Sequence, residues 1–152
     1  MTPPLVSYPV FSGDLEFTAQ PEAVYDTRRF TEAWLRKWQL EEFIDIAVLI
    51  VSELVTNSVK ATGLMETAAD GTQIRAGRSG MVTLRLRLDE ASLVVEVQDD
   101  APRAPVRRKA GCLDEDGRGL ALVAALARAW GYRRISGGKS VWAEMEISAS
   151  RG

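Results

Sequence analysis

Hydrophobic and polar residues alternate in several stretches of the chain, with the period of two that is typical of strands covered on one face. The stretches comprise residues 15–19, 82–88, 93–97, 132–135 and 141–147. A short turn separates the second stretch from the third, and another separates the fourth from the fifth, which predicts two hairpins. We therefore expect a mostly antiparallel sheet.

Apolar residues recur at helical spacing in other stretches of the chain. The first runs from Pro21 to Trp38, the second covers residues 41–62, and the third runs from Leu120 to Trp130, where Gly131 ends the pattern. In the second stretch, Asp45 is the only charged residue between Phe43 and Val51. A helix this apolar must be covered on most sides, so we expect it to lie across the middle of the sheet.

These elements predict a fold of the α+β class, a two-layer α/β sandwich with three helices on one face of the sheet. A length of 152 residues corresponds to one domain, which we place at residues 14–148. Residues 1–13 contain three prolines and are expected to form an extended arm. Residues 63–80 show no period and predict a long loop. Residues 100–118 are rich in proline, glycine and charge, and loops of this length are often functional lids or disordered.

Composition narrows the possible chemistry. The chain carries 19 basic and 21 acidic residues, a net charge of −2, so no positive field favours direct binding to nucleic acid. The apolar run at residues 46–51 is far shorter than the roughly 20 residues of a membrane span. The single cysteine, Cys112, is typical of a reducing compartment. We therefore expect a cytoplasmic protein that binds neither nucleic acid nor membrane.

The chain contains no histidine. This absence excludes Ser-His-Asp and Cys-His triads as well as zinc held by histidine. Carboxylates, amides, hydroxyls, basic side chains and backbone amides remain for chemistry. Any metal would have oxygen ligands, as Mg²⁺ prefers.

The pattern of apolar and polar residues is broken at three places. Glu53 and Asn57 lie one turn apart on the apolar helix, so both side chains share one face. Asp99 falls on the same face of its strand as Val97, which aims a carboxylate at the core. Residues 117–120, Gly-Arg-Gly-Leu, place a pair of glycines at the start of a helix.

Each of these features has a structural and a functional explanation. Local backbone groups and water can satisfy Glu53 and Asn57, a bulge can turn Asp99 outward, and glycines before helices are frequent for steric reasons. The functional explanation is a pocket with mostly apolar walls and a few polar groups. The amides at the start of a helix would favour a phosphate there.

Taken in order, four segments resemble the conserved boxes of the ATP-binding domain shared by gyrase, Hsp90, histidine kinases and MutL, the GHKL family with the Bergerat fold. The segments are Ser-Glu-Leu-Val-Thr-Asn-Ser-Val at 52–59, Val-Glu-Val-Gln-Asp-Asp-Ala-Pro at 95–102, Asp-Gly-Arg-Gly-Leu at 116–120 and Gly-Gly-Lys-Ser-Val-Trp-Ala-Glu at 137–144. The resemblance covers residues 15–147. It is strongest to anti-sigma-factor serine/threonine kinases and related actinobacterial ATP-binding regulators.

The resemblance implies a role for each matching residue. Asn57 would coordinate Mg²⁺ through its side-chain oxygen, and Glu53 would act as the general base toward an incoming hydroxyl group. Asp99 would accept a hydrogen bond from the amino group of adenine. Ser140 would lie near the adenine and support Asp99.

The resemblance also implies contacts with ATP around the lid. Gly117 and Gly119, together with the backbone of Arg118 and Leu120, would hold phosphate. Ala101, in the second box, is counted with them among the cofactor-binding residues.

The sequence departs from the family pattern in three places, one of which is the loop at residues 63–80, which is long for this branch. Family members often have Arg-His-Ala near the end of the helix that carries Asn57, whereas this chain has Lys-Ala-Thr at 60–62. The second box usually reads Asp-x-Gly-x-Gly, whereas Asp99 is followed by Asp-Ala-Pro-Arg at 100–103. Without these glycines the start of the lid should be stiffer, which affects lid geometry and turnover more than adenine binding.

The sequence predicts a regulatory protein that uses ATP and Mg²⁺. The first hypothesis is an anti-sigma-type serine/threonine protein kinase that phosphorylates an anti-anti-sigma (STAS-type) antagonist and otherwise sequesters a sigma factor. The second is a non-catalytic module in which nucleotide orders the lid for protein binding. The third is a fold unrelated to nucleotides. Relatives in this branch often pair, so the resemblance also implies a homodimer.

Overall fold

A five-stranded antiparallel sheet forms one layer of the fold. The structure is a computed structural model, and it describes residues 11–63, 65–67, 73–75, 80–100 and 115–147. The strands are β1 (Phe11–Thr18), β4 (Met81–Leu88), β5 (Ser92–Asp99), β6 (Ala129–Ile135) and β7 (Gly138–Glu146). They lie in the order β1-β4-β5-β7-β6, and every neighbouring pair is antiparallel. Both predicted hairpins, β4–β5 and β6–β7, are confirmed.

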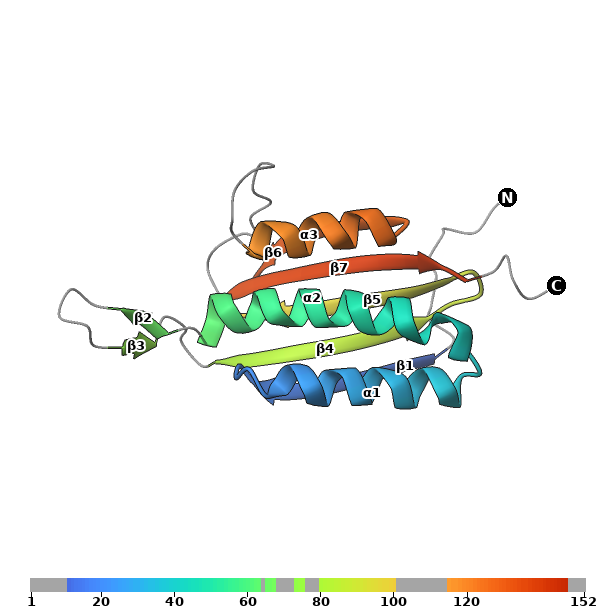
Figure 1. Cartoon of the computed structure of the whole chain (residues 1–152), viewed down its shortest axis with the longest axis horizontal. Helices are drawn as coiled ribbons and strands as arrows, with labels where there is room; N and C mark the ends of the chain where they lie inside the picture. The colour runs from blue at the N-terminus through green and yellow to red at the C-terminus, as the bar shows by residue number, and fades with distance from the viewer. Residues whose placement is uncertain (1–10, 64, 68–72, 76–79, 101–114, 148–152) are drawn as a thin grey trace.

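The second layer consists of three helices on one face of the sheet (Figure 1). They are α1 (Ala23–Lys37), α2 (Ile44–Gly63) and α3 (Glu115–Leu126), and a short 3-10 turn η1 (Glu41–Phe43) leads into α2. The middle helix, α2, packs between α1 and α3 and contacts β4, β5 and β7. The predicted two-layer α+β sandwich is therefore confirmed.

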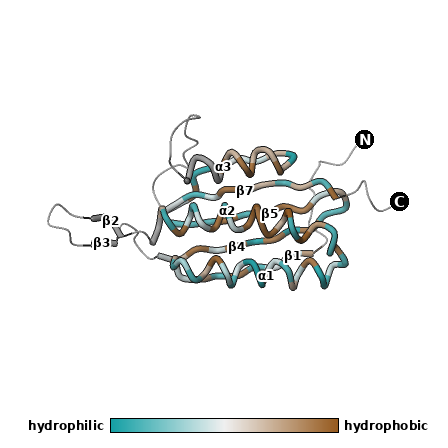
Figure 2. Tube along the Cα trace, viewed as in Figure 1, coloured by the Kyte–Doolittle hydropathy of each residue, from teal (hydrophilic) through white to brown (hydrophobic). Residues whose placement is uncertain are grey.

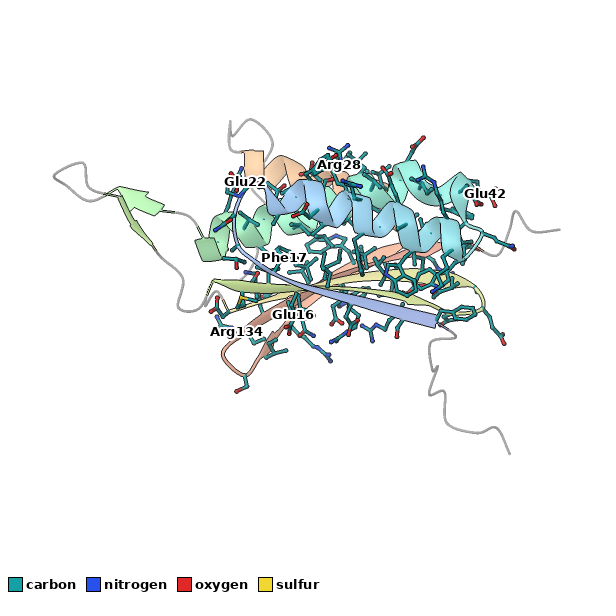
Figure 3. All side chains as sticks on the ribbon, turned by 90° about the horizontal axis from the view of Figure 1, so that it is seen from below. Glu16, Phe17, Glu22, Arg28, Glu42 and Arg134 are labelled. Carbon is teal, nitrogen blue, oxygen red and sulfur yellow. The ribbon has the colours of Figure 1, made fainter. Side chains whose placement is uncertain are left out.

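The core lies between the two layers. Val82, Leu84 and Leu86 of β4 face the helices and are almost inaccessible to solvent. The alternation continues in β1, where Phe17 points toward the helices and Glu16 toward the opposite side (Figure 3). Figure 2 shows that hydrophobic positions dominate α2, whereas they alternate with hydrophilic positions along α1. The helices leave the other face of the sheet open.

Strand β1 starts at Phe11, so residues 11–13 belong to the sheet rather than to the predicted arm. The sequence pattern does not predict the first residues of β1, because Gly13 interrupts the apolar alternation on the face directed at the helices. A Cβ atom at Gly13 would lie 2.6 Å from the indole ring of Trp34. The tryptophan therefore occupies the space that a side chain at position 13 would need, and Phe11 stacks on Trp38 beside it.

Helix α3 ends at Leu126, so the prediction that it continues to Trp130 and stops at Gly131 is wrong. Both residues belong to β6. Trp130 faces the helices and packs against the core. A Cβ atom at Gly131 would lie 2.9 Å from the ring of Trp142 on the open face. This glycine makes room for a neighbouring ring and is not a helix stop.

The segment predicted as one long loop, 63–80, contains two short antiparallel strands, β2 (Met65–Thr67) and β3 (Gln73–Arg75). Most of the predicted lid, residues 101–114, lies outside the described residues. Residues 115–118, expected at the end of the lid, already belong to α3.

Several elements meet at one end of the sheet (Figure 1). Strand β5 ends there and β7 begins there, since Asp99 is the Cα partner of Lys139. The last turns of α2 lie over the same end. Just after α3 ends, the backbone N–H of Arg128 donates a hydrogen bond to the carbonyl oxygen of Glu144, near the far end of β7. Because α3 ends at the far end of the sheet, it begins at the same end as β7. We call the meeting point of β5, β7, α2 and α3 the site end of the sheet.

Candidate functional site

The central feature of the site end is a buried ion pair between Asp99 and Lys139. Asp99 is the last residue of β5 and is 5% exposed, and Lys139 is the second residue of β7 and is 4% exposed. The ammonium nitrogen Nζ of Lys139 lies 3.0 Å from each carboxylate oxygen, Oδ1 and Oδ2, of Asp99. The prediction that Asp99 points to the inside of the sandwich is confirmed.

Strand register explains why these two side chains meet. Asp99 and Lys139 are direct Cα partners, as are Val97 and Val141 one step further along the strands. Partners in an antiparallel pair direct their side chains to the same face. The ion pair therefore continues the row of apolar pairs that faces the helices, at the place where that row reaches the site end.

Gly138 permits the strands to approach each other at this point. A Cβ atom at Gly138 would lie 1.8 Å from the carbonyl oxygen of Asp99 and 2.7 Å from Cα of Asp100. No other residue fits without a shift of the backbone, because both contacts are with main-chain atoms. Gly137, the residue before it, has a φ of +79° and turns the chain from β6 into β7. The two glycines thus serve different geometric needs.

Ser140 does not support Asp99, which corrects the sequence-based prediction. Its hydroxyl group donates a hydrogen bond to Oε2 of Glu96 on the open face of the sheet. The reason is the period of two, since Ser140 follows Lys139 directly and must point to the opposite side. Lys139 contacts Asp99 instead. The same alternation, which puts Lys139 on the face of Val141 and Ala143, could have identified this lysine from the sequence.

Glu96 is buried although it lies on the open face, with 2% of its surface exposed. Arg87 donates to its Oε1 atom at 2.7 Å, and Arg85 lies 3.5 Å from the same atom. Burial raises the pKa of Glu96, but the hydrogen bond from Ser140 and the charges of Arg87 and Arg85 together lower the pKa below its ordinary value. Glu96 is therefore ionised at neutral pH and belongs to a structural network.

Helix α2 brings Glu53 and Asn57 to its site-end half, one turn apart. Both are half-buried, at the border of the face that Leu54 and Val55 direct into the core. The amide nitrogen Nδ2 of Asn57 is buried, and no described residue offers it a hydrogen-bond partner. A buried donor without a partner is costly, which makes Asn57 a position where a ligand oxygen would be stabilising.

The predicted phosphate-binding segment lies within the first half of α3. Gly117 and Gly119 are helical, and the side chain of Leu120 is buried in the core at 1% exposure. Any contact of Leu120 with a cofactor must therefore use its backbone. The first backbone N–H groups of a helix have no partner within that helix, so the start of α3 offers amide donors to an anion. Ala101 lies outside the described residues.

The donor set fits a nucleotide and its cation. The unpartnered amide nitrogen of Asn57 suits a phosphate oxygen, and the oxygen of the same amide is a ligand of the type that Mg²⁺ prefers. Within the described part of the chain, no three histidine, cysteine, aspartate or glutamate side chains form a metal-binding group. A cation here would depend on Asn57 together with ligand oxygens. None of the described helices is long and apolar enough to span a membrane.

This architecture defines a class of protein. At one end of the sandwich lie Asp99 on a central strand, Asn57 on the covering helix and the glycine-containing start of α3. Residues 17–145 match the family described as the histidine kinase-like ATPase domain. The chain belongs to this family, and the membership implies ATP binding.

A comparison of folds gives a consistent result. The structure is similar to that of the RsbU and RsbW domains of Rv1364c from Mycobacterium tuberculosis, with a TM-score of 0.55 and 21% sequence identity. The alignment covers 90% of this chain and 32% of that chain, so the present chain spans about a third of it. No curated protein matches the sequence. The similarity at this identity concerns the fold.

Proposed function

We propose that the chain is an ATP-binding regulatory domain that acts as an anti-sigma-type serine/threonine protein kinase. The observation that carries the proposal is the carboxylate of Asp99, buried on the helix side of the sheet at the site end. A buried carboxylate that faces the helix layer at the end of the core is suited to accept a hydrogen bond from a donor on a base. The adenine amino group is such a donor.

The rest of the nucleotide would extend from Asp99 along α2 toward the start of α3. Asn57 would donate its buried, unpartnered amide to a phosphate oxygen and offer its amide oxygen to the cation. The backbone N–H groups in the first turn of α3, that of Gly117 among them, would hold the phosphates. Asn57 would hold Mg²⁺ through its amide oxygen, and the chemistry that this ion would supply is neutralisation of the phosphate charge.

Glu53 is the proposed general base. It lies one helical turn before Asn57 and therefore close to the phosphates that Asn57 would hold. In the transfer step, the carboxylate of Glu53 takes the proton of an incoming serine or threonine hydroxyl. The hydroxyl oxygen forms a bond to the γ-phosphorus, and the bond from that phosphorus to the β–γ bridging oxygen breaks, which releases ADP. No histidine is needed for this chemistry.

The proposed protein substrate is an anti-anti-sigma protein of the STAS type, and a sigma factor is the proposed second partner. The four sequence boxes resemble those of anti-sigma-factor kinases, and the fold is similar to a chain that contains an RsbW domain. We place this activity in the cytoplasm, where such partners act. Pairing with a second copy of the chain is compatible with the proposal.

A second function is favoured by a specific departure from the family pattern. Asp99 is followed by Asp-Ala-Pro-Arg where glycines are usual, and a stiff start of the lid disfavours the closure that phosphoryl transfer requires. In this case nucleotide would order the segment after β5 and thereby shape a surface for a protein partner. The domain would then be a switch that does not transfer phosphate.

Transfer of labelled phosphate separates the two functions. Wild-type protein is incubated with γ-labelled ATP, Mg²⁺ and candidate STAS-type proteins, and a Glu53→Gln variant is tested beside it. The kinase hypothesis expects label on a serine or threonine of one candidate, and at least about a hundredfold less with Glu53→Gln. Glu41→Gln, at an exposed position in η1, is the matched control and should retain full transfer.

The binding data decide what a negative result means. If ATP binds but no candidate is labelled, and a partner binds only in the presence of nucleotide, the non-catalytic switch is the correct function. If ATP does not bind, both proposed functions are wrong. Equal transfer by Glu53→Gln and wild type would show that Glu53 is not the base.

A further inference from the structure

Lys139 is an ionisable residue at the base-binding end of the site for which the proposed mechanism has no use. Its side chain is buried, and its only described hydrogen-bond partner is the carboxylate of Asp99. A buried charge at this position requires a partner, which Asp99 supplies. The remaining question is what a lysine at this place does when a nucleotide base lies against Asp99.

An ammonium group has three N–H donors and no acceptor. Two of the donors of Lys139 are directed at Oδ1 and Oδ2 of Asp99, both at 3.0 Å. Among the described residues, no acceptor takes the third. In a buried position, an unused donor on a charged group is costly, and a ligand acceptor placed beside it gains a strong hydrogen bond.

The ion pair presents an acceptor and a donor side by side. A carboxylate has about four lone-pair positions, so Asp99 can accept a further hydrogen bond while it holds Lys139. The Watson–Crick edge of adenine shows the complementary order, with the 6-amino group as a donor and ring nitrogen N1 as the neighbouring acceptor. Hydrogen bonding along this edge is how proteins commonly recognise an extruded base.

We propose that Lys139 is a specificity-determining residue that reads the base together with Asp99. Asp99 accepts a hydrogen bond from the 6-amino group of adenine, and the third N–H of Lys139 donates to N1. This inference rests on the proposed ATP binding and adds a second point of base recognition to it. Hypoxanthine reverses the order, because it carries an acceptor at position 6 and a donor at N1, and is therefore rejected at both positions.

The local structure holds the pair rigidly enough for this role. The direct register between Asp99 and Lys139 fixes the two backbones, and the absence of a side chain at Gly138 lets the strands approach closely. The lysine side chain is buried along with its charge, with 5% of its surface exposed. A donor that is already ordered loses little entropy when the base arrives.

The sharpest test changes the ligand and leaves the protein intact. Binding of ATP and of 1-deaza-ATP, in which N1 is replaced by C–H, is measured by calorimetry on the wild-type chain. The analogue keeps the 6-amino group for Asp99 and lacks only the acceptor for Lys139. We expect it to bind about tenfold to a hundredfold more weakly than ATP, the loss typical of a hydrogen bond from a charged donor.

A variant then assigns the effect to the lysine. Lys139→Met keeps most of the side-chain volume, and it should bind ATP and 1-deaza-ATP with equal affinity. Arg134→Met is the matched control, because Arg134 is the exposed cross-strand neighbour of Lys139 in β6. It should discriminate between the two nucleotides as the wild type does. If Lys139→Met does not fold, the comparison of the two nucleotides on wild-type protein still decides.

Equal affinity of the wild type for ATP and 1-deaza-ATP would overturn the role of Lys139 and leave the proposed ATP binding intact. The same conclusion follows if Lys139→Met still prefers ATP by the wild-type factor. Failure of the wild type to bind either nucleotide is a different result, since it removes the proposed function and this inference with it.

Discussion

The hydroxyl group of Ser140 donates a hydrogen bond to the carboxylate of Glu96 across two neighbouring strands, on the face of the sheet that the helices leave open. The pair of Glu96 and Ser140 and the pair of Asp99 and Lys139 are close in sequence but lie on opposite faces of the sheet. Glu96 belongs to a network on the open face, whereas Asp99 and Lys139 belong to the candidate site on the other face. Substitutions in the two centres should therefore have different consequences.

Replacing Ser140 by alanine should lower stability without weakening nucleotide binding. The variant removes the hydroxyl that satisfies Oε2 of the buried Glu96, and we expect a loss of about 1.5–3 kcal/mol in the free energy of unfolding. Urea denaturation gives the stability, and calorimetry gives the affinity for ATP. A loss of affinity greater than about tenfold in the folded variant would instead return Ser140 to the site.

Replacing Glu96 by glutamine should change how stability depends on pH. Because the pKa of Glu96 is lowered by folding, its carboxylate stabilises the folded state above about pH 4, the ordinary glutamate value. This contribution is lost as the pH falls through the folded-state pKa. The variant should thus be less stable than the wild type at pH 7, and the difference should shrink in acid.

Denaturation of both proteins between pH 3 and pH 7 measures this difference. Glu16→Gln is the control, since Glu16 is exposed on the same face in β1 (Figure 3). It should differ little from wild type over the whole range. A stability difference for Glu96→Gln that stays constant with pH would contradict the assignment of an ionised, network-bound carboxylate.

Replacing Asp99 by asparagine should weaken ATP binding about a hundredfold, because the base then loses a charged acceptor. The variant also leaves the buried Lys139 unpaired, which costs about 3–5 kcal/mol in stability. The double variant Asp99→Asn/Lys139→Met removes both charges, so it should recover much of the stability but not the affinity. Asp45→Asn, at an exposed position of α2, should change neither. Near-normal affinity in the double variant would show that Asp99 does not read the base.

Gly137 and Gly138, at the turn from β6 into β7, should respond differently to replacement by alanine. At Gly138 the new Cβ would overlap the backbone of Asp99, so Gly138→Ala should cost at least about 2 kcal/mol and weaken ATP binding by displacing that residue. At Gly137 the space is open but φ is +79°, so Gly137→Ala should cost about 1 kcal/mol with ATP affinity retained. Similar loss of affinity in both variants would refute this distinction.

The strands could be predicted because local alternation specifies a face. The same rule places Asp99 on the inside, and in β7 it places Lys139 there as well. The family resemblance points to Ser140 instead. The error at Ser140 therefore lies in the transfer of a role by analogy, whereas the residue pattern itself was informative.

Features that depend on distant residues could not be predicted in this way. Gly13 and Gly131 look like breaks in the pattern until Trp34 and Trp142 are seen to pack against them. The alternation assigns Glu96 to the outer face correctly but says nothing of its burial. That burial arises from arginines of β4 and from Ser140 of β7, which only the strand order brings together.

Because Lys139 and Ser140 point to opposite faces, a change in the register of β7 against β5 would be costly. A slip of β7 by one residue would carry the ammonium group to the open face and set a hydroxyl against Asp99. It would also turn the indole of Trp142 inward, among aliphatic residues packed for alanine and valine. Both charge and side-chain volume therefore disfavour the shifted pairing, so Lys139, Ser140 and Trp142 together hold β7 in a single register.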